Sequence, residues 1–134
     1  YVIGEHGDNQ VPVFSKVRFE GKEKRFTLKE RDEIENDIKA SALRVISKKG
    51  ATIFAPASNT VNIIEAILRD ERRLAICSVI LDGEYDLRDI SIGVPVVVGR
   101  RGVEKISEWK LDENEKEVFY RGAAKIREII GAVI

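Results

Sequence analysis

The chain contains no methionine, a single cysteine and a single histidine, and its charges cancel. Because Cys77 is alone, an internal disulfide is excluded, and its place in the apolar run 75–81 is typical of an inert buried thiol. Lysine and arginine number 23, as do aspartate and glutamate, which argues against nucleic acid or an anionic membrane as the main partner. No apolar run approaches the roughly 20 residues of a membrane span. These features favour a reducing cytoplasm, and the wealth of Lys, Arg, Glu and Ile is typical of heat-adapted proteins.

The sequence also lacks a Gly-x-Gly-x-x-Gly turn, begins inside what reads as a strand and has no initial methionine. Its 134 residues suffice for one domain with a real core. We therefore expect residues 1–134 to form a single domain, the second half of a longer enzyme that is cut at a domain boundary.

The one histidine, His6, stands in a short segment that has the features of a strand end. Residues 1–3 form an apolar run closed by Gly4, and Gly7 follows the histidine. Glycine on each side allows unusual dihedral angles and lets a ligand come close. A histidine held there is suited to proton transfer because its unperturbed pKa is near neutral. The alternative is a glycine-rich turn in which Asp8 caps backbone amides.

In the first half of the chain, hydrophobic periodicity predicts one strand and two helices. Apolar and polar residues alternate over 11–19, which is the period of a half-buried strand. A helix is predicted at about 28–49, since apolar residues recur every three or four positions, acids lie near its start and Gly50 ends it. A second helix has Pro56 in its first turn and extends to about residue 70. It is apolar almost all round, so we expect it to be buried in the full protein.

The second half of the chain predicts mainly strands. Their expected positions are residues 72–81, 90–98 and 103–110. Pro95 places the second of them at a sheet edge or a bulge, and residues 99–102 form a hairpin turn. Asp112 and Glu115 form a capping box at the start of a closing helix. Strands grouped apart from helices indicate an α+β fold with mainly antiparallel pairing.

Three blocks of sequence form a set by their order and spacing. They are Gly4-Glu5-His6-Gly7-Asp8 with Val11-Pro12-Val13, then Lys49-Gly50-Ala51-Thr52-Ile53-Phe54-Ala55-Pro56-Ala57, then Gly83-Glu84-Tyr85 with residues 92–96 and 99–106. As a set they resemble the C-terminal catalytic domain of the lactate/malate dehydrogenase family, nearest to its malate-type members. The resemblance covers nearly the whole chain, and it implies antiparallel strands combined with long helices.

The resemblance implies roles for three residues. His6 would accept the hydroxyl proton when a 2-hydroxy acid is oxidised and return it when a 2-oxo acid is reduced, beside the cofactor. Thr52 would line the substrate pocket next to the nicotinamide, the alternative being a polar residue before a helix. Pro56 would contact the nicotinamide ring. Proline there is more usual in malate-type members than in lactate enzymes, so it favours malate, with L-lactate as the alternative.

The resemblance also implies parts that lie outside the chain. The cofactor would be NAD or NADP, bound mostly by a dinucleotide-binding domain upstream. The arginine that grips the substrate carboxylate and the aspartate that orients the histidine would lie upstream too. The partners would be a small 2-hydroxy or 2-oxo acid and one or three further copies, as a homodimer or homotetramer. Asn9 departs from the family pattern, which commonly has serine at that position.

Two other functions compete with a dehydrogenase. A family-4 glycosidase has a related fold, but it requires a metal site with Cys and His ligands, and this chain has one of each. We therefore expect no metal. A non-catalytic assembly domain would use the apolar helices for dimer contacts. A Gly-x-Gly-x-x-Gly turn and an Asp-x-x-Arg helix upstream would favour the dehydrogenase.

Overall fold

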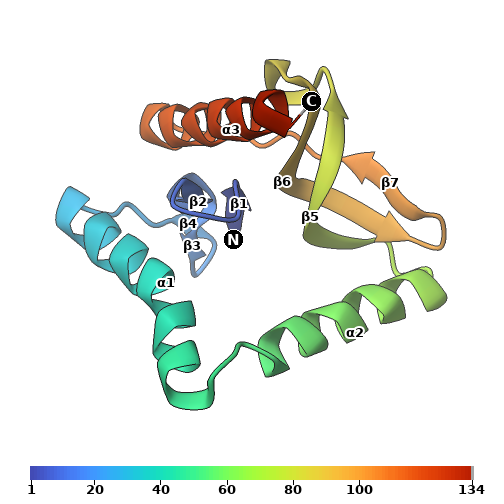
Figure 1. The fold of residues 1–134 in the computed structure, drawn as a ribbon, viewed down its shortest axis with the longest axis horizontal. Helices are drawn as coiled ribbons and strands as arrows, with labels where there is room; N and C mark the ends of the chain where they lie inside the picture. The colour runs from blue at the N-terminus through green and yellow to red at the C-terminus, as the bar shows by residue number, and fades with distance from the viewer. Residues whose placement is uncertain (134) are drawn as a thin grey trace.

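The computed structural model describes residues 1–133, which form a five-stranded sheet, a two-stranded hairpin and three long helices (Figure 1). The strands are β1 (Val2–Gly4), β2 (Gln10–Pro12), β3 (Arg18–Phe19), β4 (Lys22–Glu23), β5 (Arg73–Asp82), β6 (Arg88–Gly99) and β7 (Gly102–Ile106). The helices are α1 (Leu28–Lys49), α2 (Phe54–Leu68) and α3 (Glu113–Val133), with 3-10 turns at Phe14–Lys16 and Glu84–Asp86. The strands described pair antiparallel, so the predicted α+β class is confirmed.

β6 is the central strand of the larger sheet. It pairs with β5 along one side, and on the other side with β7 and, at Gly93 opposite Gly4, with β1. The core residues that it supplies are Ile90, Ile92, Val94, Pro95, Val96 and Val98. α3 packs over β1, β2 and β6 and buries Phe119 and Ala123 against them (Figure 1). The core therefore lies beneath α3, beside the strand that leads to His6.

The prediction of one strand over residues 11–19 is wrong. The chain leaves β2 at Pro12, makes a 3-10 turn at Phe14–Lys16 and then enters the small hairpin. Ser15 is the polar member of the alternation, and its N–H and hydroxyl both donate to the Glu115 carboxylate, at 2.8 and 2.6 Å. A partner on α3 thus turns the backbone, and local periodicity carries no sign of that partner.

Pro95 does not mark an edge, because β6 has partners on both sides. The Pro95 carbonyl accepts a hydrogen bond from the Ser107 N–H at 2.8 Å, just beyond the end of β7. In an antiparallel strand the N–H and C=O of one residue point to the same side. The missing N–H of Pro95 therefore faces the place where the neighbour of β6 changes from β1 to β7, and it removes no bond to β5. The register of β6 with β7 also shifts between Val97 and Val98.

α1 has the predicted bounds of 28–49 and well-formed ends. The Thr27 hydroxyl accepts from the Glu30 N–H at 3.3 Å, and the Glu30 carboxylate accepts from the Thr27 N–H at 2.7 Å. These two bonds form a capping box. Gly50 ends the helix at φ 80°, a left-handed conformation that favours glycine. Within residues 1–133 the helix buries none of its side chains and extends away from the sheet (Figure 1).

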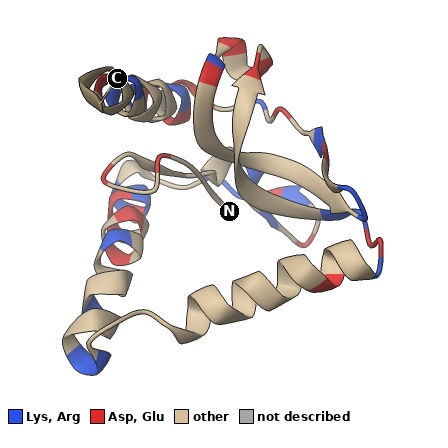
Figure 2. Ribbon diagram, turned by 45° about the vertical axis from the view of Figure 1, so that its right-hand side comes forward, with Lys and Arg blue, Asp and Glu red and all other residues tan. Residues whose placement is uncertain are grey.

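α2 returns from the far end of α1 towards the sheet and carries one charged residue, Glu65 (Figure 2). Glu65 pairs with Arg69 one turn later, at 3.4 Å. Ala66 is its buried residue within the described chain, while Phe54, Val61, Ile64 and Leu68 are exposed. No single helix in residues 1–133 is long and apolar enough to cross a membrane. α1 and α2 reach the required length and apolar composition only when they are taken together, and they are bent by 116° relative to each other.

Candidate functional site

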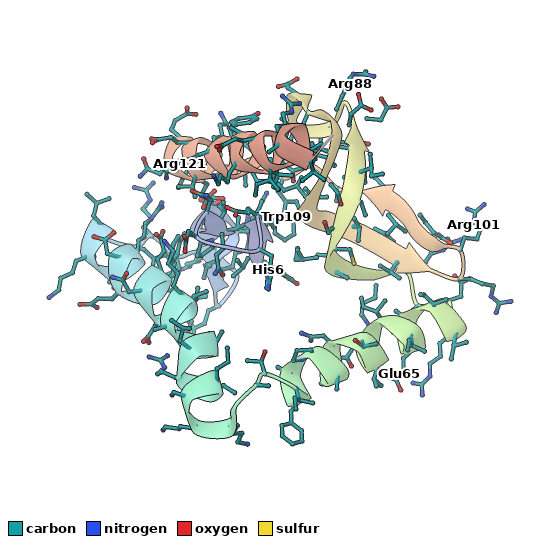
Figure 3. The ribbon with its side chains drawn as sticks, viewed as in Figure 1. His6, Glu65, Arg88, Arg101, Trp109 and Arg121 are labelled. Atoms are coloured by element: carbon teal, nitrogen blue, oxygen red, sulfur yellow. The ribbon has the colours of Figure 1, made fainter. Side chains whose placement is uncertain are left out.

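His6 lies two residues after the end of β1, with Glu5 between them, and it is exposed, with its side chain extending away from α3 (Figure 3). Gly4, two positions before it, has φ 92°, one of the unusual dihedral angles that glycines beside His6 allow. Gly93 on β6 faces Gly4 so closely that a Cβ there would lie 2.9 Å from the Gly4 carbonyl oxygen. The strand end that carries His6 is therefore set against the central strand by a contact between two glycines.

The turn after β1 is closed by a pair of side chains that the sequence analysis does not single out. Glu5 Oε2 accepts hydrogen bonds from the Asn9 side-chain Nδ2 at 2.6 Å and from the Asn9 N–H at 3.3 Å. We call this pair the Glu5–Asn9 clip. The signal available in the sequence is a carboxylate and an amide four positions apart on either side of the glycine-flanked histidine. The sequence also allowed a turn in which Asp8 caps backbone amides. In the structure the carboxylate that holds this turn belongs to Glu5.

His6 lines a groove of about 400 Å³ between the end of β1 and the β5–β6 pair. Its polar lining includes Gln10, Ser78 and Ser91, and the two serine hydroxyls lie 2.9 Å apart. Cys77 also lines the groove and is half-buried, so the prediction of a buried thiol is wrong in degree. Partial burial still raises the pKa of the Cys77 thiol above its ordinary value, which keeps it protonated and weakly reactive.

Thr52 and Pro56 lie at a different place, the corner between α1 and α2. Thr52 lines a hollow of about 560 Å³ with apolar residues from the start of α2 and with Arg44, Lys48 and Lys49 from the end of α1. Pro56 is exposed in the first turn of α2, as predicted, where a missing N–H removes no helical bond. In the described part of the chain, the groove at His6 and the hollow at Thr52 share no lining residue. The structure thus leaves both Thr52 and Pro56 apart from His6.

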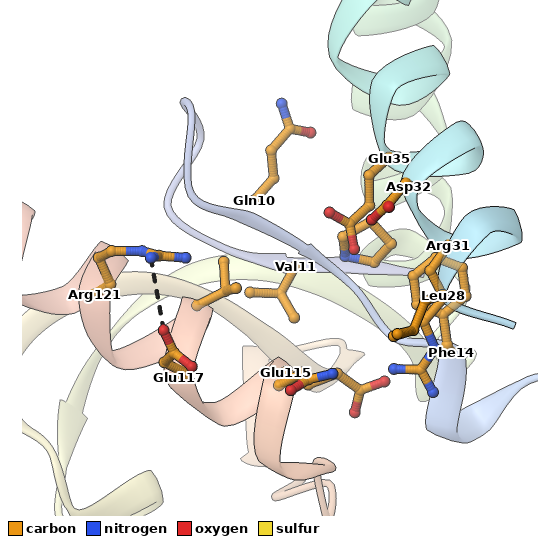
Figure 4. A pocket seen from close by; sticks show the side chains of 13 residues that line it. Gln10, Val11, Phe14, Leu28, Arg31, Asp32, Glu35, Glu115, Glu117 and Arg121 are labelled. Atoms are coloured by element: carbon orange, nitrogen blue, oxygen red, sulfur yellow. Dashed lines mark ion pairs between the residues drawn. The ribbon is translucent and has the colours of Figure 1, made fainter. Parts of the chain in front are cut away.

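A third hollow, of about 250 Å³, lies where the starts of α1 and α3 meet (Figure 4). Its charged lining is Arg31, Asp32, Glu35, Glu115, Glu117 and Arg121. Arg31 reaches out of α1 to pair with Asp112 at 2.8 Å, which ties the two helix starts together. Burial of Asp112 opposes its ionisation, but the Glu115 N–H and the Arg31 guanidinium outweigh it and lower the pKa of Asp112. None of the predicted site residues lies here, and we regard the hollow as a structural junction.

Among residues 1–133, no three acidic, cysteine or histidine side chains gather closely enough to hold a metal ion. The groups with functional chemistry are thus an exposed imidazole on a groove of mixed polar and apolar lining, and a hydroxyl beside an apolar corner with three basic residues.

These features define a class of α+β domain that presents its one histidine, on a glycine-closed turn, to an open groove. The whole chain, residues 1–134, matches the family described as lactate/malate dehydrogenase, alpha/beta C-terminal domain. The chain belongs to this family, and the resemblance stated from the three sequence blocks is confirmed.

Both branches of the family are represented among the similar proteins. A malate dehydrogenase of Halobacterium salinarum is 47% identical over 125 residues, which are 93% of this chain and 41% of that protein. An L-lactate dehydrogenase of Bacillus velezensis is 38% identical over an alignment of 138 positions, which covers 97% of this chain and 44% of that protein. The chain spans less than half the length of these relatives.

Solved structures agree with the fold. The malate dehydrogenase from Aeropyrum pernix superposes with a TM-score of 0.89 at 29% identity, covering 97% of this chain and 44% of that one. The minor L-lactate dehydrogenase from Enterococcus mundtii has a TM-score of 0.92 at 29% identity, covering 100% of this chain and 45% of that one. The positions of β1, the sheet and the three helices are therefore those of the family's C-terminal domain.

Proposed function

We propose that this chain is the proton-transferring half of a nicotinamide-dependent 2-hydroxy-acid dehydrogenase that interconverts malate and oxaloacetate. One observation carries the proposal. The only histidine of the chain is exposed on a groove, just beyond a strand end set by the Gly4–Gly93 contact, within the sequence block that resembles the family's active site. L-lactate and pyruvate are the second candidate pair, because lactate dehydrogenases are also among the relatives.

In this proposal His6 accepts the hydroxyl proton at a ring nitrogen as malate is oxidised, and returns it to the carbonyl oxygen in the reverse direction. Hydride transfer is the chemistry that the nicotinamide supplies when it is bound. For the ring end of such a cofactor the chain offers the apolar surface of exposed Pro56 and the exposed imidazole of His6, two groups that this chain alone leaves apart. The sequence has no Gly-x-Gly-x-x-Gly turn for the phosphates, so a dinucleotide-binding half must hold them. Whether that half selects NAD or NADP depends on residues outside this chain.

Two observations favour malate over lactate. Pro56 stands where the resemblance associates proline with malate-type members. The malate dehydrogenase of H. salinarum is also more similar to this chain than the lactate dehydrogenase of B. velezensis, at 47% against 38% identity.

The outer helices supply the surface for assembly. Their exposed apolar side chains are Leu43, Val45, Ile46 and Ile53 near the corner, and Phe54, Val61, Ile64 and Leu68 along α2. Apolar surface of this extent marks a site that another part of a protein covers. In this proposal the dinucleotide-binding half and a second copy of the chain cover it, giving a homodimer or a homotetramer. A purely structural assembly domain would need the same faces, but it would not need an exposed histidine on a groove.

The experiment compares the full-length protein, its His6→Gln variant and the 134-residue chain alone. We expect the full-length protein to oxidise NADH or NADPH with oxaloacetate faster than with pyruvate. His6→Gln should lower kcat about a hundred- to ten-thousand-fold with little change in cofactor affinity, because it removes a general acid–base group. Lys22→Ala, an exposed change in the β3–β4 hairpin, is the matched control. Turnover by the isolated chain, or an undiminished rate in His6→Gln, would refute the assignment.

A further inference from the structure

We propose that the Glu5–Asn9 clip and Gly122 of α3 are positioning residues that set where the His6 imidazole stands. This inference rests on the proposed role of His6 in proton transfer. It adds that the closing helix, which is distant from His6 in sequence, holds the turn from behind.

The clip fixes the turn from within. Glu5 and Asn9 flank the segment that contains His6, and their side chains meet at 2.6 Å across it. A second bond, from the Asn9 N–H to the same carboxylate oxygen at 3.3 Å, prevents the turn from opening. The amide nitrogen of Asn9 lies two bonds beyond Cβ, which lets this side chain reach the Glu5 carboxylate.

Gly122 fixes the turn from outside. A Cβ at this position would lie 3.1 Å from Glu5 Cβ and 3.3 Å from Asn9 Cβ, so α3 touches both members of the clip. Glycine is less favourable than alanine inside a helix, and at this position a larger side chain would meet the clip. Gly131 lies in the same helix, and among the described residues nothing comes within 4 Å of a Cβ placed there. The two glycines thus form a natural pair of test positions.

The consequence is a geometric one for the reaction. A side chain added at Gly122 forces the clip to move by a few tenths of an ångström, because its contacts are tighter than ordinary van der Waals packing. His6 lies between the two clip residues and has to move with them. Proton transfer depends steeply on the placement of the catalytic group, and a displacement of about 1 Å costs roughly a hundred-fold in rate.

The first measurement uses the 134-residue chain. His6 is its only histidine, so the ring gives one identifiable set of signals in a ¹H–¹³C NMR spectrum. We expect Gly122→Ala and Glu5→Ala to shift these signals and Glu5→Gln, whose amide oxygen still accepts the Asn9 bonds, to return them towards the parent position. Gly131→Ala should leave them in place. Unshifted signals in both Gly122→Ala and Glu5→Ala would overturn the proposal.

The second measurement uses steady-state kinetics of the full-length protein. Gly122→Ala should lower kcat about ten-fold with an unchanged KM for the cofactor, Glu5→Ala should act likewise, and Glu5→Gln should recover most of the loss. Gly131→Ala again should behave as the parent. If Gly122→Ala does not fold, the test is the comparison of kcat between Glu5→Ala and Glu5→Gln. Equal rates for these two variants would overturn the proposal. A full rate in His6→Gln would refute the function itself, whereas an impaired His6→Gln with unimpaired clip variants would refute only the positioning role.

Discussion

Glu115 and Ser15 are separated by 100 residues, yet the Glu115 carboxylate accepts hydrogen bonds from both the N–H and the hydroxyl of Ser15, at 2.8 and 2.6 Å. The same carboxylate accepts the Asp112 N–H at 2.9 Å, which closes the capping box of α3. Glu115 is 4% exposed, so this carboxylate is buried, and it accepts three hydrogen bonds from Ser15 and Asp112. It joins the first turn of α3 to the bend that follows β2.

We expect Glu115→Ala to lower the free energy of unfolding by at least about 3 kcal/mol, because it leaves several donors unpaired and each costs about 1–3 kcal/mol. Urea denaturation followed by circular dichroism measures this change. Glu117→Ala, on the same helix and exposed, is the control and should change the value by less than about 0.5 kcal/mol. A Glu115→Ala protein as stable as the parent would show that the buried bonds contribute little.

The Arg31–Asp112 pair predicts acid sensitivity. The folded state lowers the pKa of Asp112 below its unfolded value, so the ionised carboxylate stabilises the fold above that unfolded value, and the stability is lost as the pH falls through the folded pKa. Asp112→Asn should therefore reduce stability near pH 7, while its unfolding free energy should fall less steeply below about pH 4. Asparagine still caps a helix, so the variant isolates the charge. Parallel stability curves for variant and parent from pH 7 to pH 2 would contradict this expectation.

The buried hydroxyl of Tyr85 is expected to contribute to the stability of the fold. This hydroxyl accepts a hydrogen bond from the backbone N–H of Trp109 at 2.8 Å, and the Tyr85 ring packs on Phe119 with centroids 5.0 Å apart. Tyr85→Phe keeps the ring but leaves the Trp109 N–H without its acceptor, so we expect a loss of about 1–3 kcal/mol in thermal or chemical unfolding. Tyr120→Phe removes a more exposed hydroxyl, which donates to the Tyr85 carbonyl at 3.1 Å, and should cost less. Equal losses in the two variants would argue against a special role for the buried hydroxyl.

Replacement of Thr52 is expected to weaken the use of the 2-oxo acid by the full-length protein. A hydroxyl in a closed pocket can bond a polar substrate group, and losing it costs about 1 kcal/mol, or more if the partner stays unpaired. Thr52→Ala should lower kcat/KM for the 2-oxo acid roughly ten-fold, since about 1.4 kcal/mol corresponds to a factor of ten. Thr60→Ala is the matched control, because its hydroxyl bonds the Pro56 carbonyl within the same helix. An unchanged kcat/KM in Thr52→Ala would mean that the sequence block 49–57 serves only as the start of a helix.

Local patterns in the sequence predict the long elements well. α1 has strong periodicity and a glycine stop, and its bounds match the prediction at both ends. The capping box at Asp112 and the hairpin turn at residues 99–102 also form as predicted, because their chemistry is confined to a few neighbouring residues. Each of these features depends on groups within about four positions of each other in the chain.

The failures of prediction come from partners distant in sequence. Ser15 leaves the strand pattern because of Glu115, and Pro95 is tolerated in a central strand because two different neighbours meet beside it. The turn that holds His6 follows from its glycines, but the contact of Gly122 with that turn depends on tertiary packing. The roles of His6, Thr52 and Pro56 stay predictions, since the groups that would complete the site lie outside this chain.

The exposed corner between α1 and α2 provides a way to follow assembly by experiment. Residues 50–53 connect two helices whose apolar sides are open, and the connection is exposed throughout. Proteases cut preferentially at such unprotected connections, and a tightly docked surface shields them. The rate of cleavage at this corner therefore reports directly whether another part of the protein or a second copy has docked on the two helices, even before any turnover is measured.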